Sequence, residues 1–386
     1  MVEIAALSVL VLWAYLLAAR GGFWLGRERD DRGELPAPAA WPRITAVIPA
    51  RDEADAIARS VRSLLGQDYP GELRAVVVDD CSQDSTATVA ADAAVEAGAA
   101  ERLTVLPGRP LPQGWTGKVW AQKQGIDAAT AGPHAPAYLL LTDADIAYEP
   151  DALRRLVARA ENGGYALTSV MAKLRCESFA ERCIVPAFIF FFQMLYPFAW
   201  VNRRESATAA AAGGCMLVRS DALAASGAID AIRGALIDDC ALARQMKKVG
   251  PIWLGLSERV TSIRAYEGFG PLRKMITRSA YAELRYSPLR LAGMTVAMAL
   301  MFLAAPLLAV FASGTAQMLG AAAWAAMTLA FQPTLRLYKL SPYWGVALPA
   351  IAAFYMIWTL ESALQYARGQ GGAWKGRIQA MPRGAR

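Results

Sequence analysis

The two ends of this 386-residue chain are far more apolar than its middle, and this contrast limits the folds that the chain can adopt. Residues 4–19 are almost wholly apolar, and three further apolar runs cover residues 289–312, 318–331 and 344–360. Because a membrane-spanning helix needs about 20 apolar residues, the first and last of these three runs are long enough, whereas the middle one is marginal. The pattern predicts a central domain with membrane segments on either side.

Composition and charge agree with a membrane protein. Hydrophobic residues make up 55% of the chain and charged residues 19%, whereas soluble domains carry about 25% charged residues. The net charge of +7 is too small to indicate nucleic-acid binding, and it fits basic residues beside a membrane. Five cysteines without C-x-x-C spacing and a single histidine, His134, indicate no zinc site, disulfide framework or Ser-His-Asp triad.

The ends of the chain make conflicting predictions about membrane topology. Residues 1–26 are expected to form an uncleaved N-terminal anchor, with a signal peptide as the alternative, because no basic residue precedes the apolar run. Arg27, Arg29 and Arg32 place the next segment in the cytoplasm, and the basic tail at 367–386 also favours the cytoplasm. Three C-terminal spans would leave that tail outside. A re-entrant middle run or a further membrane segment at 184–200 would remove the conflict, and both remain open.

Residues 271–288 form a separate basic and apolar segment. Its basic side chains alternate with leucine, isoleucine and tyrosine, which is typical of an amphipathic helix on an anionic membrane surface. The alternative is an ordinary solvated helix face. Residues 289–366 are then expected to contain the C-terminal transmembrane helices.

Residues 42–270 have the pattern of an α/β domain. Short apolar runs predict strands at 44–48, 75–79, 103–106, 138–142 and 166–170. Amphipathic stretches predict helices at 53–65, 84–97, 118–129 and 151–159. This alternation favours a mostly parallel sheet, whose ligands bind at the carboxyl ends of the strands.

Acidic residues follow several of these apolar runs. They occur in four groups, at 52–53, 79–84, 143–145 and 238–239. The Asp143-x-Asp145 pair predicts a divalent-metal site, because hard cations prefer oxygen ligands and Mg²⁺ is typically held by one or two carboxylates plus substrate phosphates. Asp238 and Asp239 are candidates for a general base, although acids at the start of a helix are also favoured by the helix dipole. Asp84 is equally well explained as a helix cap.

The ordered set of motifs resembles family 2 glycosyltransferases of the GT-A fold. The matching segments are IPARDE at 48–53, VVVDDCSQDST at 76–86, LLTDAD at 140–145, AAGGCMLVRSDAL at 211–223 and IDDCALARQM at 237–246. Two further segments, GWTGKVWA at 114–121 and the tail sequence Trp374-Lys375-Gly376-Arg377, resemble hopanoid-associated glycosyltransferases, with ceramide and carotenoid glycosyltransferases as relatives.

This resemblance implies a Rossmann-like GT-A domain in the cytoplasm, held at the bacterial inner membrane by several spans. Asp143 and Asp145 would hold Mg²⁺ or Mn²⁺ on the diphosphate, and Asp239, paired with Asp238, would be the general base. The resemblance assigns donor contacts to a larger group of residues: Pro49, Arg51, Glu53, Asp79, Asp80, Lys118, Asp143, Gly213, Gly214, Arg278 and Arg377. For Lys118, a solvated position at a helix start is the alternative.

The implied reaction moves one sugar, with inversion, from a nucleotide sugar, expected to be UDP-linked, to a membrane lipid alcohol of hopanoid-like kind. The Gln-x-x-Arg-Trp motif of processive members is missing, and Arg278 occupies a comparable place. A polyprenyl-phosphate or ceramide glycosyltransferase is the alternative within the enzymes. A non-catalytic lipid-binding membrane protein is the alternative from another class.

Overall fold

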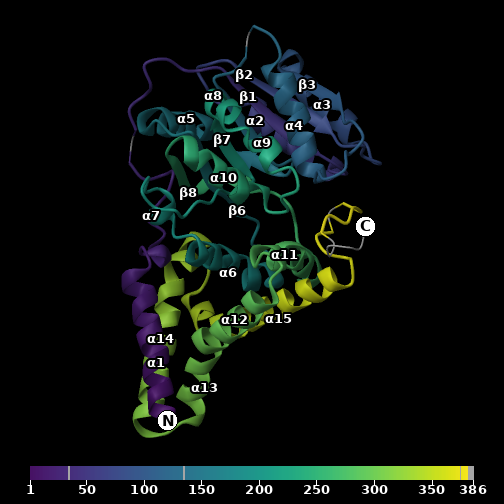
Figure 1. The fold of residues 1–386 in the computed structure, drawn as a ribbon. Helices are drawn as coiled ribbons and strands as arrows, with labels where there is room; N and C mark the ends of the chain where they lie inside the picture. The colour runs from purple at the N-terminus through teal and green to yellow at the C-terminus, as the bar shows by residue number, and fades with distance from the viewer. Residues whose placement is uncertain (34, 134, 374, 381–386) are drawn as a thin grey trace. The chain divides into compact units, whose positions relative to one another are not determined.

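The computed structural model describes residues 1–33, 35–133, 135–373 and 375–380, so His134 and Trp374 lie outside the described residues. The chain divides into two compact units, drawn in Figure 1. The sheet unit comprises residues 28–175 and 200–264, and the helical unit comprises residues 1–27, 176–199 and 265–386. The expected α/β domain at 42–270 therefore includes two segments, 176–199 and 265–270, that the structure groups with the helical unit.

An eight-stranded sheet forms the centre of the sheet unit. Its strands follow the order β3-β2-β1-β4-β7-β6-β8-β5. Their bounds are β1 (Ile44–Ala50), β2 (Leu73–Asp79), β3 (Leu103–Pro107), β4 (Tyr138–Thr142), β5 (Ile146–Tyr148), β6 (Leu167–Leu174), β7 (Cys215–Arg219) and β8 (Ile252–Ser262).

The sheet is mixed but mostly parallel, as the sequence predicts, because six of its eight strands (β1, β2, β3, β4, β6 and β8) run in one direction. Strands β3, β2, β1 and β4 are parallel to one another, and β6 is parallel to β8. Strand β7, however, runs antiparallel to both of its neighbours, β4 and β6, and β5 runs antiparallel to β8. The sequence pattern did not predict β5, β7 or β8, so both strands that run against the others, β5 and β7, were missing from the expectation.

Helices cover both faces of the parallel half of the sheet. Alternate residues of a strand point to opposite faces. Ile44, Ala46 and Ile48 of β1 share a buried core with apolar residues of α2 (Ala54–Leu65), α3 (Thr86–Glu96) and α5 (Ala152–Gly163). On the other face, a Cβ at Gly125 of α4 (Gly117–Thr130) would lie 2.5 Å from Val47, so the missing side chain lets α4 approach the sheet closely.

Short helices complete the sheet unit. Helix α8 (Ser220–Ser226) and α9 (Ala228–Ala231) follow β7, and α10 (Asp238–Val249) precedes β8. A 3-10 turn, η2 (Ala100–Arg102), precedes β3, and α7 (Phe198–Val201) lies where the chain passes from the helical unit to the sheet unit. The predicted helices at 53–65, 84–97, 118–129 and 151–159 are confirmed by α2, α3, α4 and α5, which begin or end within a few residues of the expected positions.

The helical unit is assembled from segments far apart in the sequence. Its elements are α1 (Val2–Ala19), η1 (Phe23–Leu25), α6 (Phe179–Leu195), α11 (Phe269–Glu283), α12 (Pro288–Met298), η3 (Ala299–Leu303), α13 (Ala304–Phe311), α14 (Gly314–Leu337), η4 (Pro342–Gly345) and α15 (Leu348–Ala367). By length and apolar composition, two stretches among the described residues are long enough to cross a membrane, namely 2–19 and 288–311. The predicted spans at 318–331 and 344–360 fall in α14 and α15, which do not meet that test.

Helix α6 is a core helix of the helical unit. By composition alone, its phenylalanine cluster at residues 188–192 would suit either a core or a lipid-facing surface. Phe190 is fully buried, and its ring lies 5.4 Å from Phe23 and 5.3 Å from Phe331. Phe191 is also buried, with its ring 4.8 Å from that of Tyr355. The central aromatic side chains of this segment are covered by other helices of the same unit, which favours the core over the lipid-facing surface.

Candidate active site

Acidic side chains gather at one edge of the sheet, as the sequence predicts. The parallel strands β1 and β2 end side by side, with Ala50 paired to Asp79. At the same edge, Thr142 at the end of β4 is paired to Cys215 at the start of the antiparallel strand β7. The carboxyl ends of parallel strands are the usual ligand-binding edge of such sheets.

The loops after β1 and β2 are tied together by side-chain hydrogen bonds. Arg51 donates to the carbonyl oxygens of Asp80 at 2.5 Å and Cys81 at 3.0 Å. Asp52 accepts a hydrogen bond of 2.7 Å from the N–H of Gln83. Asp52 lies in the left-handed region, with φ of 51°. Asparagine and aspartate tolerate this region better than most residues, which suits an aspartate at this position.

Three other residues that are predicted to contact the nucleotide-sugar donor lie at the same edge of the sheet. Pro49 is buried within β1, opposite Val78. Asp80 is fully buried directly after β2. Asp79 accepts a hydrogen bond of 3.2 Å from the backbone N–H of Ser82. Pro49, Asp79 and Asp80 therefore shape the loop at this edge, and their contact with a donor remains a prediction.

Arg264 connects two of the predicted site carboxylates. Its Nε donates to Oδ2 of Asp145 at 2.7 Å, and its terminal nitrogen lies 2.7 Å from both carboxylate oxygens of Glu53. Burial lowers the pKa of Arg264, but the charges of Asp145 and Glu53 raise it, and the net shift is upward. The arginine therefore stays charged and fixes Glu53 of the first loop against the Asp-x-Asp segment.

Lys118 occupies the centre of a second charged cluster. Its Nζ lies 2.7 Å from Oδ1 of Asp143 and 3.3 Å from Oδ2 of Asp238. Burial lowers the pKa of Lys118, but the charges of Asp143 and Asp238 raise it well above its ordinary value. The lysine is therefore an internal cation, and the alternative of a solvated helix-start lysine is wrong.

Asp239 is held in place by backbone hydrogen bonds. Its Oδ2 accepts from the N–H of Gly213 at 3.0 Å, and its Oδ1 accepts from the N–H of Cys240 at 2.7 Å. Burial and the neighbouring charge of Asp238 raise the pKa of Asp239 to about 6, although Lys118 opposes this shift. A carboxylate with this pKa is suited to remove a proton near neutral pH.

The glycine pair before β7 permits these close contacts. A Cβ at Gly213 would lie 3.1 Å from Nζ of Lys118 and 3.3 Å from Oδ2 of Asp239. A Cβ at Gly214 would lie 3.0 Å from the side chain of Ile146. The carbonyl of Gly214 accepts a hydrogen bond of 2.8 Å from the hydroxyl of Thr142, which links β4 to the glycine pair.

Residues 45–227 match the family model of glycosyl transferase family 2. The chain carries a glycosyltransferase domain of family 2.

Two curated proteins match parts of the chain. The succinoglycan biosynthesis protein ExoO of Rhizobium meliloti (strain 1021) is 36% identical over 132 residues, which cover 33% of each chain. An N-acetylglucosaminyltransferase of Mesorhizobium japonicum is 27% identical over 155 residues, or 39% of this chain and 34% of that protein. The chain thus spans about a third of the length of these relatives.

A solved structure resembles the chain over most of its length. The mannosyltransferase PcManGT from Pyrobaculum calidifontis, determined in complex with GDP-Man and Mn²⁺, superimposes with a TM-score of 0.53 and 17% sequence identity. The match covers 94% of this chain and 99% of that one. This likeness shows the fold, and the family 2 domain is a mixed α/β sheet of the GT-A-like kind.

Asp143 and Asp145 of the family 2 domain can hold a cation only with help from other ligands. The ion pairs described above use Oδ1 of Asp143 and Oδ2 of Asp145, which leaves a second oxygen on each carboxylate. Within residues 1–33, 35–133, 135–373 and 375–380, no three His, Cys, Asp or Glu side chains are grouped to hold a metal. Mg²⁺ usually completes its shell with water and substrate phosphates, so the donor set fits a metal that arrives with a diphosphate.

Two features of the site in the family 2 domain were missed from the sequence. Arg264 follows directly after β8, a strand that the pattern did not predict, so nothing placed this arginine at the site edge. The ion pairs of Lys118 join α4 to β4 and α10, which are far apart in the chain. Arg278 and Arg377 belong to the helical unit, and their assignment to the donor diphosphate stays a prediction.

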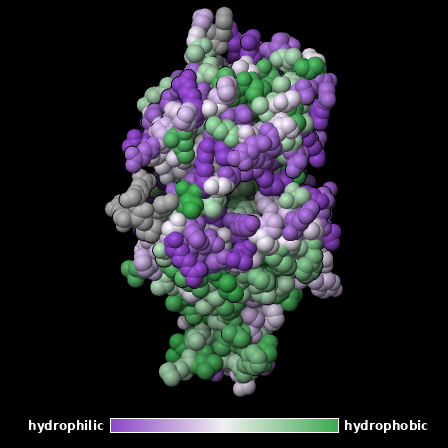
Figure 2. Space-filling view, turned by 90° about the vertical axis from the view of Figure 1, so that its right-hand side faces the viewer, coloured by the Kyte–Doolittle hydropathy of each residue, from purple (hydrophilic) through white to green (hydrophobic). Residues whose placement is uncertain are grey.

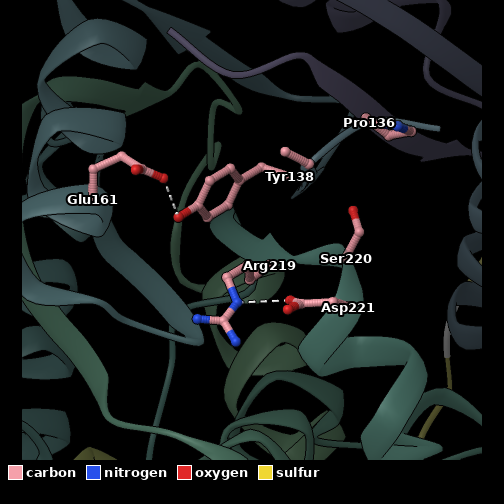
Figure 3. Close-up of a pocket in the computed structure, with 7 residues that line it drawn as sticks. Pro136, Tyr138, Glu161, Arg219, Ser220 and Asp221 are labelled. Carbon is pink, nitrogen blue, oxygen red and sulfur yellow. Dashed lines mark hydrogen bonds and ion pairs between the residues drawn. The ribbon is translucent and has the colours of Figure 1, made fainter. Parts of the chain in front are cut away.

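A separate pocket of about 350 Å³ lies at the opposite edge of the sheet, shown in Figure 3. Tyr138 at the start of β4 and Arg219 at the end of β7 line it. In the close-up, the Tyr138 hydroxyl points to Glu161, to which it donates at 2.6 Å, and Arg219 points to Asp221 at 2.6 Å. These polar groups satisfy one another, and the pocket is not part of the acidic edge.

Proposed function

We propose that the chain transfers one sugar from a nucleotide-sugar donor to the hydroxyl group of a membrane lipid, with inversion at the anomeric carbon. The observation that carries this proposal is the geometry of Asp239. Two backbone N–H groups fix its carboxylate beside Lys118, and its pKa of about 6 leaves it ionised at neutral pH. Such a carboxylate suits the removal of a proton from an acceptor hydroxyl.

The acidic edge supports the donor part of the proposal. We expect the loops after β1 and β2 to hold the nucleoside and Lys118 to approach the donor's phosphate or sugar. PcManGT was solved with GDP-Man and Mn²⁺, which agrees with a nucleotide-sugar donor and a divalent metal for this fold. The UDP-linked donor is our expectation from the resemblance of the motifs.

The metal site of this proposal is Asp143 and Asp145. A bound Mg²⁺ or Mn²⁺ would supply positive charge to the diphosphate as it leaves. Lys118 and Arg264 are each within ion-pair distance of one of these carboxylates, so they compensate the acidic charge of the edge before a donor arrives. Without such compensation, several carboxylates this close together would repel one another.

The proposed reaction is a single displacement. Asp239 accepts the proton of the acceptor hydroxyl, the oxygen bonds to the anomeric carbon, and the bond from that carbon to the diphosphate breaks on the opposite face. An α-linked donor would therefore give a β-glycoside. Holding the two reactants in this orientation contributes to the rate beyond the proton transfer itself.

The membrane part of the proposal rests on the helical unit. Two stretches, 2–19 and 288–311, are long and apolar enough to span a bilayer, and Figure 2 shows hydrophobic residues gathered over the lower part of the face in view, where α13 lies. The hopanoid-like acceptor is proposed from the resemblance of the segment at 114–121 and the tail motif. A bacterial inner-membrane location with the sheet unit in the cytoplasm completes the proposal.

A donor and acceptor screen tests this function. The full-length protein in detergent would be incubated with Mg²⁺ or Mn²⁺ and a panel of nucleotide sugars, with and without extracted membrane lipids. We expect metal-dependent release of nucleoside diphosphate that increases with lipid, and a glycolipid product. A folded sample that neither binds nor turns over any nucleotide sugar would instead support the non-catalytic alternative. Release that depends on a polyprenyl phosphate would support the alternative acceptor.

A further inference from the structure

Helices α1, α13 and α14 form one bundle within the helical unit (Figure 1). The indole N–H of Trp13 donates to the carbonyl of Met301 at 2.7 Å, and the Trp13 ring lies 5.6 Å from that of Phe302. A Cβ at Gly320 of α14 would lie 2.6 Å from Leu308 of α13, so the two helices approach closely at this glycine. Close approach through small residues is typical of helices that associate within a bilayer.

One end of this bundle is basic. Helices α1 and α14 run in the same direction (Figure 1). Basic residues lie at or just after the C-terminal end of each helix. Arg20 follows α1, whereas Arg336 and Lys339 lie at the end of α14 and are exposed. The opposite end, at residues 1–5 and around the turn between α13 and α14 (305–320), carries the N-terminal amino group and Glu3 but no lysine or arginine side chain. By the positive-inside rule, the basic end faces the cytoplasm.

Helix α15 packs along α11 and does not pack along the bundle of α1, α13 and α14. Arg273 of α11 forms a salt bridge with Glu361 of α15, with nitrogen–oxygen distances of 2.5–2.9 Å. The rings of Phe269 and Phe354 are stacked with their centroids 5.6 Å apart. In Figure 1, α15 lies crosswise to α14. A helix in this orientation cannot run parallel to the three-helix bundle through a bilayer.

The α11–α15 pair combines an apolar stripe with exposed positive charge. Phe354, Ile357 and Leu364 of α15 are 39%, 55% and 56% exposed, and their spacing places them on one side of the helix. Arg273 and Lys274 of α11 are also exposed. Exposed apolar side chains beside basic residues are typical of helices that lie in the headgroup layer of an anionic membrane.

Aromatic side chains extend this surface. Phe179 is 69% exposed and lies against Phe269 and Trp344, with ring centroids 6.4 and 5.7 Å apart. Tyr343, next to Trp344, is 83% exposed. Tryptophan and tyrosine are enriched where a membrane meets water, because their rings are apolar and their polar groups remain hydrated.

We propose that α11 and α15 lie together in the headgroup layer of an anionic bilayer, and that α15 does not cross the membrane. The proposal rests on the membrane part of the proposed function. It also removes the topology conflict in the sequence. Residues 2–19 and 288–311 meet the length and composition test for a span, and α14, which does not, would cross with them because it packs along both α1 and α13. With these three crossings and with α15 at the surface, the chain after α15 lies on the same side as Arg20.

Depth-dependent fluorescence quenching tests this proposal on the full-length protein. Single cysteines labelled with a small fluorophore would be placed at Ile357 and Leu364 of α15 and, as a matched control, at Val11 and Ile4 of α1. All four positions are exposed, and each pair is seven residues apart. Seven residues correspond to about 10 Å along a helix axis. The variants would be reconstituted in vesicles containing phosphatidylglycerol, with quenchers attached either near the headgroup or deep in the acyl chain.

The proposal predicts the same shallow depth for Ile357→Cys and Leu364→Cys. For the control pair, Val11→Cys should be quenched mainly by the deep quencher and Ile4→Cys by the shallow one. A deep position for Ile357→Cys with a shallow one for Leu364→Cys would show that α15 crosses the bilayer and would overturn the proposal. If neither quencher reduced the fluorescence at Ile357→Cys and Leu364→Cys, α15 would lie outside the membrane, and this result would also overturn the proposal.

A labelling experiment gives an independent result. In intact spheroplasts, a membrane-impermeant thiol reagent should label Ser313→Cys, between α13 and α14, and should leave Gln370→Cys, after α15, unlabelled. Labelling of Gln370→Cys from outside would contradict the proposal. Neither measurement depends on sugar transfer, so the failure of this proposal is distinguishable from the failure of the proposed enzymatic function.

Discussion

The backbone N–H of Gly213 donates a 3.0 Å hydrogen bond to Oδ2 of Asp239. This bond joins the turn before β7 to the first turn of α10, two segments that are 26 residues apart in the chain. It fixes the carboxylate that we propose as the base, and it requires a residue without a side chain, because Lys118 and Asp239 occupy the space next to Gly213.

Gly213→Ala should therefore reduce sugar transfer. Its Cβ would lie 3.1 Å from Nζ of Lys118 and 3.3 Å from Oδ2 of Asp239, so these groups must shift by a few tenths of an ångström. Since small misplacements of catalytic groups are costly, we expect kcat to fall about tenfold with little change in thermal stability. Gly270→Ala is the matched control, because nothing lies within 4 Å of a Cβ built there. Unchanged kcat in Gly213→Ala would remove the argument for close positioning.

Transfer should depend on pH through Asp239. Its pKa is raised to about 6 by burial and by Asp238, so the carboxylate takes up a proton as the pH falls through this value. A base must be ionised to act, and kcat/KM should therefore fall about tenfold for each pH unit below 6. A pH profile of kcat/KM measured from pH 4.5 to 8.5 checks this. A flat profile across pH 5–7 would exclude Asp239 as the base.

Lys118→Met should shift this fall of kcat/KM at acid pH to higher pH values. The positive charge of Lys118 lowers the pKa of Asp239, and its removal leaves the carboxylate with the opposing effects of burial and Asp238. The substitution also removes the cation that lies between Asp143 and Asp238. Breaking such a buried pair should cost about 3–5 kcal/mol of unfolding free energy. Lys123→Met, whose lysine pairs only with exposed Asp127 on the same helix, is the control.

Arg264→Ala should weaken the fold and make divalent metal more stabilising. The arginine is paired with Asp145 and Glu53, and its loss leaves two carboxylates without their shared cation. Losing these charged hydrogen bonds should cost about 2–3 kcal/mol. If Asp145 ligates metal, the increase in melting temperature on adding Mn²⁺ should be larger in Arg264→Ala than in the wild type. Arg244→Ala, at an exposed position of α10, should behave as the wild type. An equal metal effect in all three proteins would contradict the assignment of Asp145.

Lys247 positions the segment that leads to the glycine pair. Its Nζ donates to the carbonyl oxygens of Val201 at 2.7 Å and Thr208 at 2.6 Å. Lys247→Met keeps the apolar stem and removes these two bonds and a longer one of 3.4 Å to the carbonyl of Trp200. We therefore expect a loss of about 1–3 kcal/mol and a lower kcat with nearly unchanged donor KM. Chemical denaturation and steady-state kinetics measure the two effects, and Lys248→Met, whose lysine is exposed on the next position of α10, is the control. A loss of stability without any change in kcat would show that Lys247 is structural only.

The sequence predicted the parallel half of the sheet because each of its strands is a short, continuous apolar run. Strands β1, β2, β3 and β4 have this pattern, and helices with an apolar face follow three of them. Strand β7 follows directly after Gly213 and Gly214 and was seen only as a motif, and β5 has just three residues. Local pattern cannot show that β7 inserts between β4 and β6, because this pairing depends on contacts distant in sequence.

The acidic residues of the site were also visible in the sequence, whereas their partners were not. Asp143, Asp145 and Asp239 stand at the ends of predicted elements, where ligands usually bind. Arg264 follows an unpredicted strand, so its ion pairs with Glu53 and Asp145 could not be anticipated. In the helical unit, the phenylalanine-rich α6 has the composition of a lipid-facing segment. Only tertiary packing shows that Phe190 is enclosed by other helices.

Substitution of Asp239 by asparagine tests the central claim most directly. Asparagine preserves the size of the side chain and removes its ability to accept a proton. Transfer of sugar to extracted lipid should fall about 10²–10⁴-fold in Asp239→Asn, while binding of the nucleotide sugar should stay close to that of the wild type. The melting temperature should fall only modestly, because the amide oxygen can accept one of the two backbone hydrogen bonds and the amide nitrogen cannot accept the other. Asp230→Asn, at an exposed position of α9, should retain full transfer. Wild-type transfer by Asp239→Asn would contradict the account, because no proton-accepting carboxylate would then be required at this position.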